Sequence, residues 1–264
     1  MLEIKNIYKT FNPGTINEKV ALNGLSLKLN EGDFVTVIGG NGAGKSTMLN
    51  AVAGVWPVDE GQIIIDGTDV TRLSEYKRAA YLGRVFQDPM TGTAATMGIE
   101  ENLALAKRRG KTRFLRSGIT KAEREEYKEL LKILNLGLED RLTSKVGLLS
   151  GGQRQALTLL MATLQKPKLL LLDEHTAALD PGTAEKVLNL TKSIIAEHHL
   201  TCMMITHNMQ SALELGNRTF MMNSGHIIFD TANEERSKLT VNDLLERFKE
   251  GVGKQLDNDR MLLS

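Results

Sequence analysis

The sequence has little cysteine and no long apolar run. Cys202 is the only cysteine among 264 residues, so the chain cannot form an internal disulfide. Because Cys202 lies in the apolar run 202–205, we expect a small buried residue there rather than a reactive thiol. A single cysteine also agrees with a reducing cytoplasm.

No stretch approaches the roughly 18 to 20 apolar residues that a helix needs to cross a bilayer. Residues 1–5 alternate between apolar and polar side chains, which predicts an opening strand and not a signal peptide. If this protein works at a membrane, we therefore expect another chain to supply the membrane-spanning part.

The sequence also lacks an excess of charge of one sign, because its formal net charge is +1. This balance argues against a general affinity for nucleic acid or acidic lipid. The segment 107–116 is locally basic, with six basic residues in ten, and an acidic stretch follows it at 123–129. We expect a solvated face here, with a nucleic-acid or lipid site as the less favoured alternative.

Short β-branched or leucine-rich runs alternate with helical patterns, which predicts an α/β fold with a mainly parallel sheet. The predicted strands are 34–38, 62–65, 169–172, 201–205 and 218–222. The run 169–172 is apolar at every position, as expected for a central strand covered on both faces. Strands near 2–8 and 21–29 alternate instead and predict a small antiparallel sheet.

Three segments have apolar residues at helical spacing, and each predicts a helix with one face toward a core. Thr120 and Glu123 form a predicted capping box before the first, and Thr240 is a predicted N-cap before the third. The three stripes are Tyr127, Leu130, Leu131 and Leu134; Leu157, Leu160, Met161 and Leu164; and Val241, Leu244, Leu245 and Phe248.

Residues 39–47 match G-x-x-x-x-G-K-[ST] between a predicted strand and a predicted helix, the setting of a phosphate-binding loop. Backbone N–H groups and the helix N-terminus can surround phosphate oxygens there. Lys45 can reach the β- and γ-phosphates of ATP, and the Ser46 hydroxyl can bind Mg²⁺. The expected nucleotide-binding residues are Gly39, Asn41, Gly42, Ala43, Gly44, Lys45, Ser46 and Thr47.

Two carboxylates follow the buried run 169–172 directly. In open α/β sheets, ligands bind at the carboxyl ends of strands. We expect Asp173 to bind the Mg²⁺ shared with Ser46, and Glu174 to activate the attacking water as the general base. Beside a phosphate loop, this pair favours hydrolysis over nucleotide storage.

Residues 149–155 read Leu-Ser-Gly-Gly-Gln-Arg-Gln. Ser150 and Gln153 fit a capping box, and the two glycines leave the helix start open to an anion. This is the LSGGQ signature, and the sequence resembles the ATP-binding-cassette (ABC) ATPases over nearly its whole length. The resemblance implies a dimer in which the signature of one copy, Ser150, Gly151, Gly152 and Gln153, contacts the ATP held by the other.

The other family motifs occur in the expected order, and the resemblance implies their roles. Gln87 resembles the Q-loop glutamine, which contacts Mg²⁺ or the attacking water and signals to the membrane partner. Residues 178–180 resemble the D-loop, where Asp180 lies at the dimer interface and can also cap the helix opened by Pro181. His207 resembles the switch histidine, which contacts the γ-phosphate and holds Glu174 in place.

Two positions leave alternatives open. Phe11 occupies the place of the aromatic residue that stacks on adenine, and Tyr8 competes for that role. His175 stands where the family commonly has proline after the catalytic glutamate. Proline would stiffen this turn by fixing φ, so we expect a tolerated variant at His175 rather than an additional catalytic residue.

The sequence therefore predicts an ABC ATPase domain over 1–240, with a helical subdomain at about 90–165, and a C-terminal helix and tail over 241–264. The resemblance implies three partners, which are a second copy, a separate transmembrane permease subunit and an extracytoplasmic substrate-binding protein. The permease subunit would hold the chain at the cytoplasmic face of the membrane. Import is favoured, with amino acids as a candidate substrate. The alternatives are a soluble ABC protein acting on nucleic acid or ribosomes, and a non-hydrolysing switch.

Overall fold

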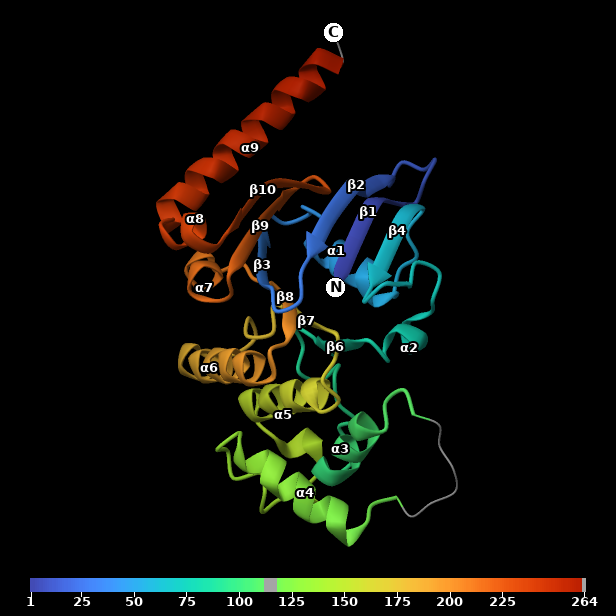
Figure 1. Cartoon of the computed structure of the whole chain (residues 1–264), viewed down its shortest axis with the longest axis vertical. Coiled ribbons are helices and arrows are strands. Elements are labelled where there is room, and N and C mark those ends of the chain that lie inside the picture. Colours follow the sequence, from blue (N-terminus) through green and yellow to red (C-terminus); the bar gives the residue numbers. More distant parts are fainter. Residues whose placement is uncertain (112–117, 263–264) are drawn as a thin grey trace. The chain divides into compact units, whose positions relative to one another are not determined.

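The computed structural model describes residues 1–111 and 118–262, with only the helix backbone described for 252–262 (Figure 1). The chain forms two compact units, Met1–Arg78 with Thr201–Ser264, and Ala79–Leu200. Among the described residues, no helix combines the length and the apolar character that crossing a bilayer requires.

The first unit contains the predicted antiparallel sheet. Its strand order is β2 (Lys19–Leu29), β1 (Leu2–Phe11), β4 (Glu60–Ile65) and β5 (Thr68–Asp69). Ile4 lies opposite Leu27 on one side and Ile63 on the other, and all three side chains are buried. The alternating pattern thus places one face of the sheet in the core. The short helix α2 (Glu75–Arg78) follows.

Parallel strands in the same unit lead to the predicted phosphate loop. β3 (Phe34–Gly39) pairs in parallel with β8 (Thr201–Ile205) and β9 (Arg218–Asn223). β3 continues through the loop into α1 (Lys45–Ala53). These strands agree with the predicted ranges within one residue, and Cys202 is fully buried as expected. Burial also raises the pKa of its thiol.

The sequence reading missed β10 (His226–Ala232), which pairs antiparallel with β9. Ser224 and Gly225 join the two strands, and both have positive φ (45° and 80°). Positive φ at both central residues characterises a tight hairpin turn, so this Ser-Gly pair was the available signal.

The C-terminal helices pack on the first unit. α7 (Met209–Glu214), α8 (Asn233–Ser237) and α9 (Val241–Leu262) follow β8 and β10. Thr240 caps α9 as predicted, because its hydroxyl accepts a hydrogen bond from the Asp243 N–H at 3.3 Å. Leu244 is buried with Ile38 and Met221, but Leu245 is 40% exposed. The predicted stripe is therefore wrong at Leu245.

The second unit holds the parallel pair β6 (Leu82–Val85) and β7 (Leu169–Asp173) and most of the helices. The helices are α3 (Ile99–Lys107), α4 (Lys121–Lys132), the 3₁₀ turn η1 (Val146–Leu148), α5 (Gly151–Thr163) and α6 (Pro181–His198). The predicted Thr120 capping box is present at α4. Tyr127, Leu131 and Leu157 of the predicted stripes are fully buried in one core.

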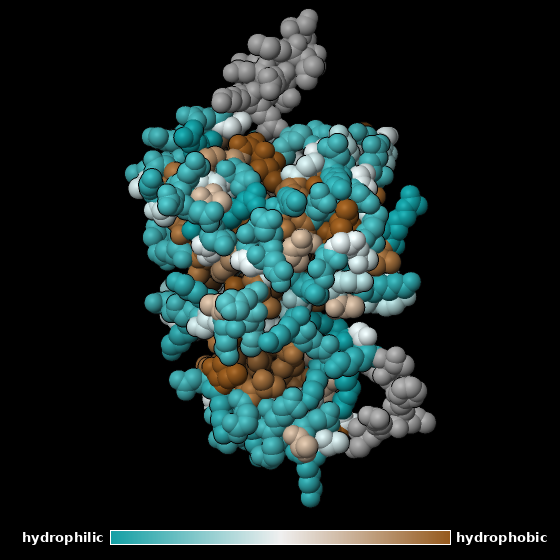
Figure 2. Space-filling model, viewed as in Figure 1, coloured by the Kyte–Doolittle hydropathy of each residue, from teal (hydrophilic) through white to brown (hydrophobic). Residues whose placement is uncertain are grey.

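An apolar groove remains between the helices of this unit. Figure 2 shows apolar side chains gathered over α4 and α5, where Leu130, Ile133, Leu160 and Leu164 line the groove. Ile133 is the most exposed of them, at 52%.

Three basic side chains in the described part of the basic segment contact neighbouring helices. Lys107 forms an ion pair with Glu126, and Arg108 pairs with Glu123 at 2.9 Å. Arg109 donates a hydrogen bond to the Ala162 carbonyl at 3.3 Å. These basic side chains therefore fasten α3 to α4 and α5. Residues 112–117 of the predicted solvated face lie outside the described residues.

Candidate nucleotide site

The phosphate loop connects β3 to α1, and Lys45 is the first residue of that helix. Its side chain is buried, and its ammonium group donates hydrogen bonds to the carbonyls of Gly39 at 2.8 Å and Gly40 at 3.0 Å. The ammonium group thus bridges two carbonyls of the loop and lies at the N-terminus of α1. Both features favour binding of an anion at this place.

Gly44 shows why the loop needs glycine. Its φ is 97°, and a Cβ there would lie 2.5 Å from the Ala21 carbonyl oxygen. A side chain would therefore strain the backbone and collide with β2. The N–H of Gly225 also donates to the Ala43 carbonyl at 3.0 Å, which ties the loop to the β9–β10 turn.

His207 follows the strand next to the phosphate loop. Val37 of β3 pairs with Ile205 of β8, and the Thr206 N–H donates to the Val37 carbonyl at 3.1 Å. Because β3 and β8 are parallel, their carboxyl ends lead to the phosphate loop and to His207 side by side. The first unit thus brings together two motifs that are about 160 residues apart in the sequence.

Phe11 and Tyr8 have different surroundings on β1. Phe11 packs edge-to-face against Trp56, with ring centroids 4.9 Å apart. Trp56 follows the C-terminal end of α1, so Phe11 lies near that end of the helix, whereas the phosphate loop precedes its N-terminal end. Tyr8 instead covers Gly24 of β2. Phe11 therefore remains the predicted adenine-stacking residue, with Tyr8 as the alternative, and Trp56 is a partner of Phe11 that the sequence did not indicate.

Asp173, Glu174 and Gln87 come from the carboxyl ends of two paired strands in the second unit. Val85 of β6 lies opposite Leu172 of β7 in a parallel register. Gln87 follows Val85 and Asp173 follows Leu172 within two residues. The Q-loop and the two carboxylates therefore start at the same edge of this strand pair, its carboxyl end.

Arg84 on β6 is a site residue that the sequence reading missed. Its guanidinium lies 3.9 Å from the Asp173 carboxylate and 4.4 Å from the ring centroid of Phe86. A cation here partly balances the negative charge of Asp173. The sequence feature that could have indicated Arg84 is a basic residue inside an otherwise apolar strand just before the Q-loop.

The signature helix α5 begins as predicted. Ser150 is the N-cap, its hydroxyl accepts from the Gln153 N–H at 3.2 Å, and the Gln153 side chain accepts from the Ser150 N–H at 3.2 Å. A Cβ on Gly152 would lie 2.1 Å from the Thr183 Cγ2 atom on α6. Glycine therefore allows the signature to pack closely on the start of α6.

Asp180 caps α6, and Pro181 is the first residue of that helix, as predicted. The Asp180 carboxylate accepts a hydrogen bond from the Thr183 N–H at 3.1 Å. Its hydrogen bonds to Thr183 lower the pKa of Asp180. The D-loop and the signature thus meet at the same helix end.

Gln155 connects the signature helix to the Q-loop. Its side chain is fully buried, and Nε2 donates to the Phe86 carbonyl at 3.0 Å, next to Gln87. The sequence reading missed this contact because the two residues are 69 positions apart.

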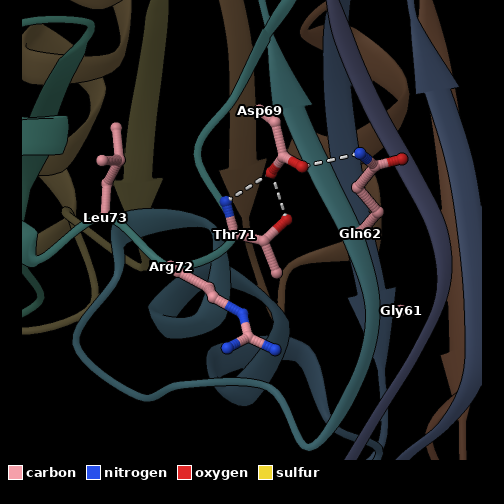
Figure 3. Close-up of a pocket in the computed structure, with 6 residues that line it drawn as sticks. All are labelled: Gly61, Gln62, Asp69, Thr71, Arg72 and Leu73. Atoms are coloured by element: carbon pink, nitrogen blue, oxygen red, sulfur yellow. Dashed lines mark hydrogen bonds between the residues drawn. The ribbon is translucent and has the colours of Figure 1, made fainter.

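Figure 3 shows a surface pocket on the β4–β5 hairpin. Asp69 in this pocket accepts hydrogen bonds from Gln62 at 2.7 Å and from the Thr71 hydroxyl at 2.6 Å. These bonds lower the pKa of Asp69 to about 2. Its carboxylate is engaged within the hairpin, and none of the predicted site residues line the pocket. This pocket therefore gives no reason to move the predicted nucleotide site away from the phosphate loop.

The predicted site residues thus form two groups. The first unit holds the phosphate loop, Phe11 and His207, and the second holds Gln87, Asp173, Glu174 and the signature. The proposed metal ligands Ser46, Gln87 and Asp173 offer hydroxyl, amide and carboxylate oxygens. This oxygen set is the chemistry that Mg²⁺ requires, with phosphate oxygens and water completing its shell.

Comparison with known proteins gives consistent matches. The family described as "ABC transporter" matches residues 22–177. A tyrosine transport ATP-binding protein of Clostridioides difficile (strain R20291) is 44% identical over 257 residues, which are 96% of this chain and 100% of the relative. A phosphonates import ATP-binding protein of Treponema denticola is 34% identical, and the match covers 87% of this chain and 89% of the relative.

Solved structures show the same fold. A dimeric ATP-binding cassette in a post-hydrolysis state, bound to ADP and Pi, is 31% identical with a TM-score of 0.75, and the match covers 88% of this chain and 98% of that one. The ADP conformation of a cassette from an ABC transporter has a TM-score of 0.77 at 28% identity, with 94% and 98% coverage.

Proposed function

The chain belongs to the ABC transporter family of ATPases, and we propose that it drives import of an amino acid through a separate membrane-spanning subunit. The observation that carries the ATP-driven part of this proposal is that one chain contains a phosphate loop bridged by Lys45 and a signature helix capped by Ser150. In the proposed working form, two copies bind two ATP molecules head to tail, so that each signature faces the loop of the other copy.

We take 1–240 as the ATPase domain, with its helical subdomain at about 90–165, and 241–264 as a C-terminal helix and tail.

The proposed roles follow from chemistry and position. The phosphate loop binds ATP through backbone N–H groups and Lys45, and Phe11 stacks on adenine. Ser46, Asp173 and Gln87 hold Mg²⁺, which when bound neutralises charge on the phosphate oxygens. Glu174 accepts a proton from the attacking water, and His207 contacts the γ-phosphate and holds Glu174.

Amino acid import is supported by the 44% identical relative, whose name specifies tyrosine transport. Another relative is named for phosphonates import, so the substrate class rests on the more similar of the two. An extracytoplasmic binding protein would deliver the substrate, and the chain would lie at the cytoplasmic face of the membrane. The alternative of a soluble ABC protein acting on nucleic acid or ribosomes has less support, because both named relatives are transport subunits.

The loop 89–97 is the proposed contact for the permease. It starts beside Gln87, and its second half is fastened to α3, where the Asn102 side chain accepts from the Ala94 N–H at 2.8 Å. Met90 is an apolar residue of this loop with 49% exposure. An exposed apolar side chain on a loop that is fastened to a helix suits a protein partner.

The test is purification of the tagged chain from gently solubilised membranes of its host. We expect a multispanning protein to co-purify, and Met90→Glu to reduce its recovery about tenfold while ATP binding is retained. The exposed substitution Tyr76→Glu on α2 serves as the control. Recovery of soluble partners alone, with ATPase activity stimulated by nucleic acid or ribosomes, would contradict the transport role.

A further inference from the structure

His175 comes directly after the proposed base in the chain and is buried. Its side chain is 2% exposed, and its Nε2 atom lies 3.0 Å from the hydroxyl oxygen of Thr191, which is fully buried on α6. His175 follows Glu174 in the chain, so this contact ties the backbone of the proposed base to a helix.

The hydrogen-bond partners of Thr191 determine the direction of the contact. The Thr191 hydroxyl has one proton, and it donates to the Val187 carbonyl at 2.8 Å. The hydroxyl must therefore accept from His175, which requires a proton on Nε2. His175 therefore acts as the hydrogen-bond donor in this contact.

The segment between Glu174 and α6 needs such support. Glu174 has a φ of 46°, in the left-handed region that non-glycine residues rarely adopt unless their surroundings hold them there. The Ala177 N–H donates to the Glu174 carbonyl at 2.9 Å within this segment. Asp180 fastens the far end to the first turn of α6, and His175 fastens the near end to Thr191. Residues 174–180 are thus attached to one helix at both ends.

We propose that the His175–Thr191 hydrogen bond is a clasp that positions Glu174 for hydrolysis. His175 and Thr191 are positioning residues in this account, because neither needs to touch ATP. The clasp supplies by a hydrogen bond the kind of stiffness that a proline at this position would supply by fixing φ. This inference rests on the proposed role of Glu174 as base.

The test compares steady-state ATP hydrolysis by Thr191→Val and by two matched variants. We expect Thr191→Val to lower kcat about tenfold with little change in KM for ATP, because only the geometry of the base changes. Thr191→Ser keeps the hydroxyl and should stay within about twofold of the unmodified chain. Thr163→Val is the control, since Thr163 is a buried α5 threonine that donates to Leu159 at 3.0 Å. It should leave kcat unchanged.

A double variant separates positioning from stability. Thr191→Val alone leaves the buried His175 N–H without its acceptor, so the thermal midpoint should fall. His175→Leu together with Thr191→Val removes both partners, which should restore the midpoint while kcat stays about tenfold low. If kcat recovers with the midpoint, the bond is merely structural and the proposal is wrong. Unchanged kcat in Thr191→Val would also overturn it.

Glu174→Gln, assayed in parallel, distinguishes this proposal from the one on which it rests. An inactive Glu174→Gln with a fully active Thr191→Val would overturn the clasp and leave the base assigned. An active Glu174→Gln would overturn the base itself, and the clasp with it.

Discussion

Glu174→Gln should lower the ATP turnover of this chain by about a hundredfold or more, the usual contribution of a positioned general base. The amide has nearly the shape of the carboxylate but cannot accept the proton of the attacking water. ATP affinity should change little, because the phosphate loop and Lys45 carry the binding. Single-turnover hydrolysis and equilibrium binding of ATP, measured on the same preparation, check both parts.

The matched control for this variant is Glu185→Gln, which changes an exposed glutamate on α6. It should hydrolyse ATP at the unmodified rate. Near-normal turnover by Glu174→Gln would show that Glu174 is not the general base. Another residue would then have to accept the proton of the attacking water.

Lys45→Ala should weaken ATP binding itself, by about tenfold to a hundredfold, the range for losing charge-assisted hydrogen bonds. The ammonium group is buried and closes the loop through the carbonyls of Gly39 and Gly40. Its removal takes away both the charge that faces the phosphates and a brace of the loop.

Isothermal titration with ATP and Mg²⁺ measures this effect, and circular dichroism verifies that the variant is folded. Lys132→Ala, an exposed lysine of α4, is the control and should bind ATP normally. ATP affinity unchanged by Lys45→Ala would argue against the assigned role of the lysine.

The local features of the fold were predictable because they depend on neighbours in the sequence. The capping boxes at Thr120 and Ser150 occur as expected, since a cap needs only residues three apart. The buried strand 169–172 was predictable from its unbroken leucines. Leu245 fits the helical spacing of the predicted stripe but is 40% exposed, because α9 buries Leu244 and leaves the flank that carries Leu245 open to solvent.

The supporting contacts of the site were not predictable. Thr191 behind His175, Gln155 beside Phe86 and Arg84 beside Asp173 each depend on how separate elements pack. A sequence shows that such polar residues exist within apolar patterns, but their partners are set by tertiary packing. The motifs located the reacting groups, and the structure was needed to find what holds them.

The central claim is that the signature of one copy closes over the ATP of another, and sedimentation of Glu174→Gln tests it most directly. With ATP and Mg²⁺, we expect this variant to shift from monomer to dimer, because ATP is bound and not hydrolysed. Adding Ser150→Phe should abolish the dimer while each chain still binds ATP. A doubly substituted chain that dimerises as readily as Glu174→Gln alone, or an ATP-bound Glu174→Gln that stays monomeric, would contradict the claim.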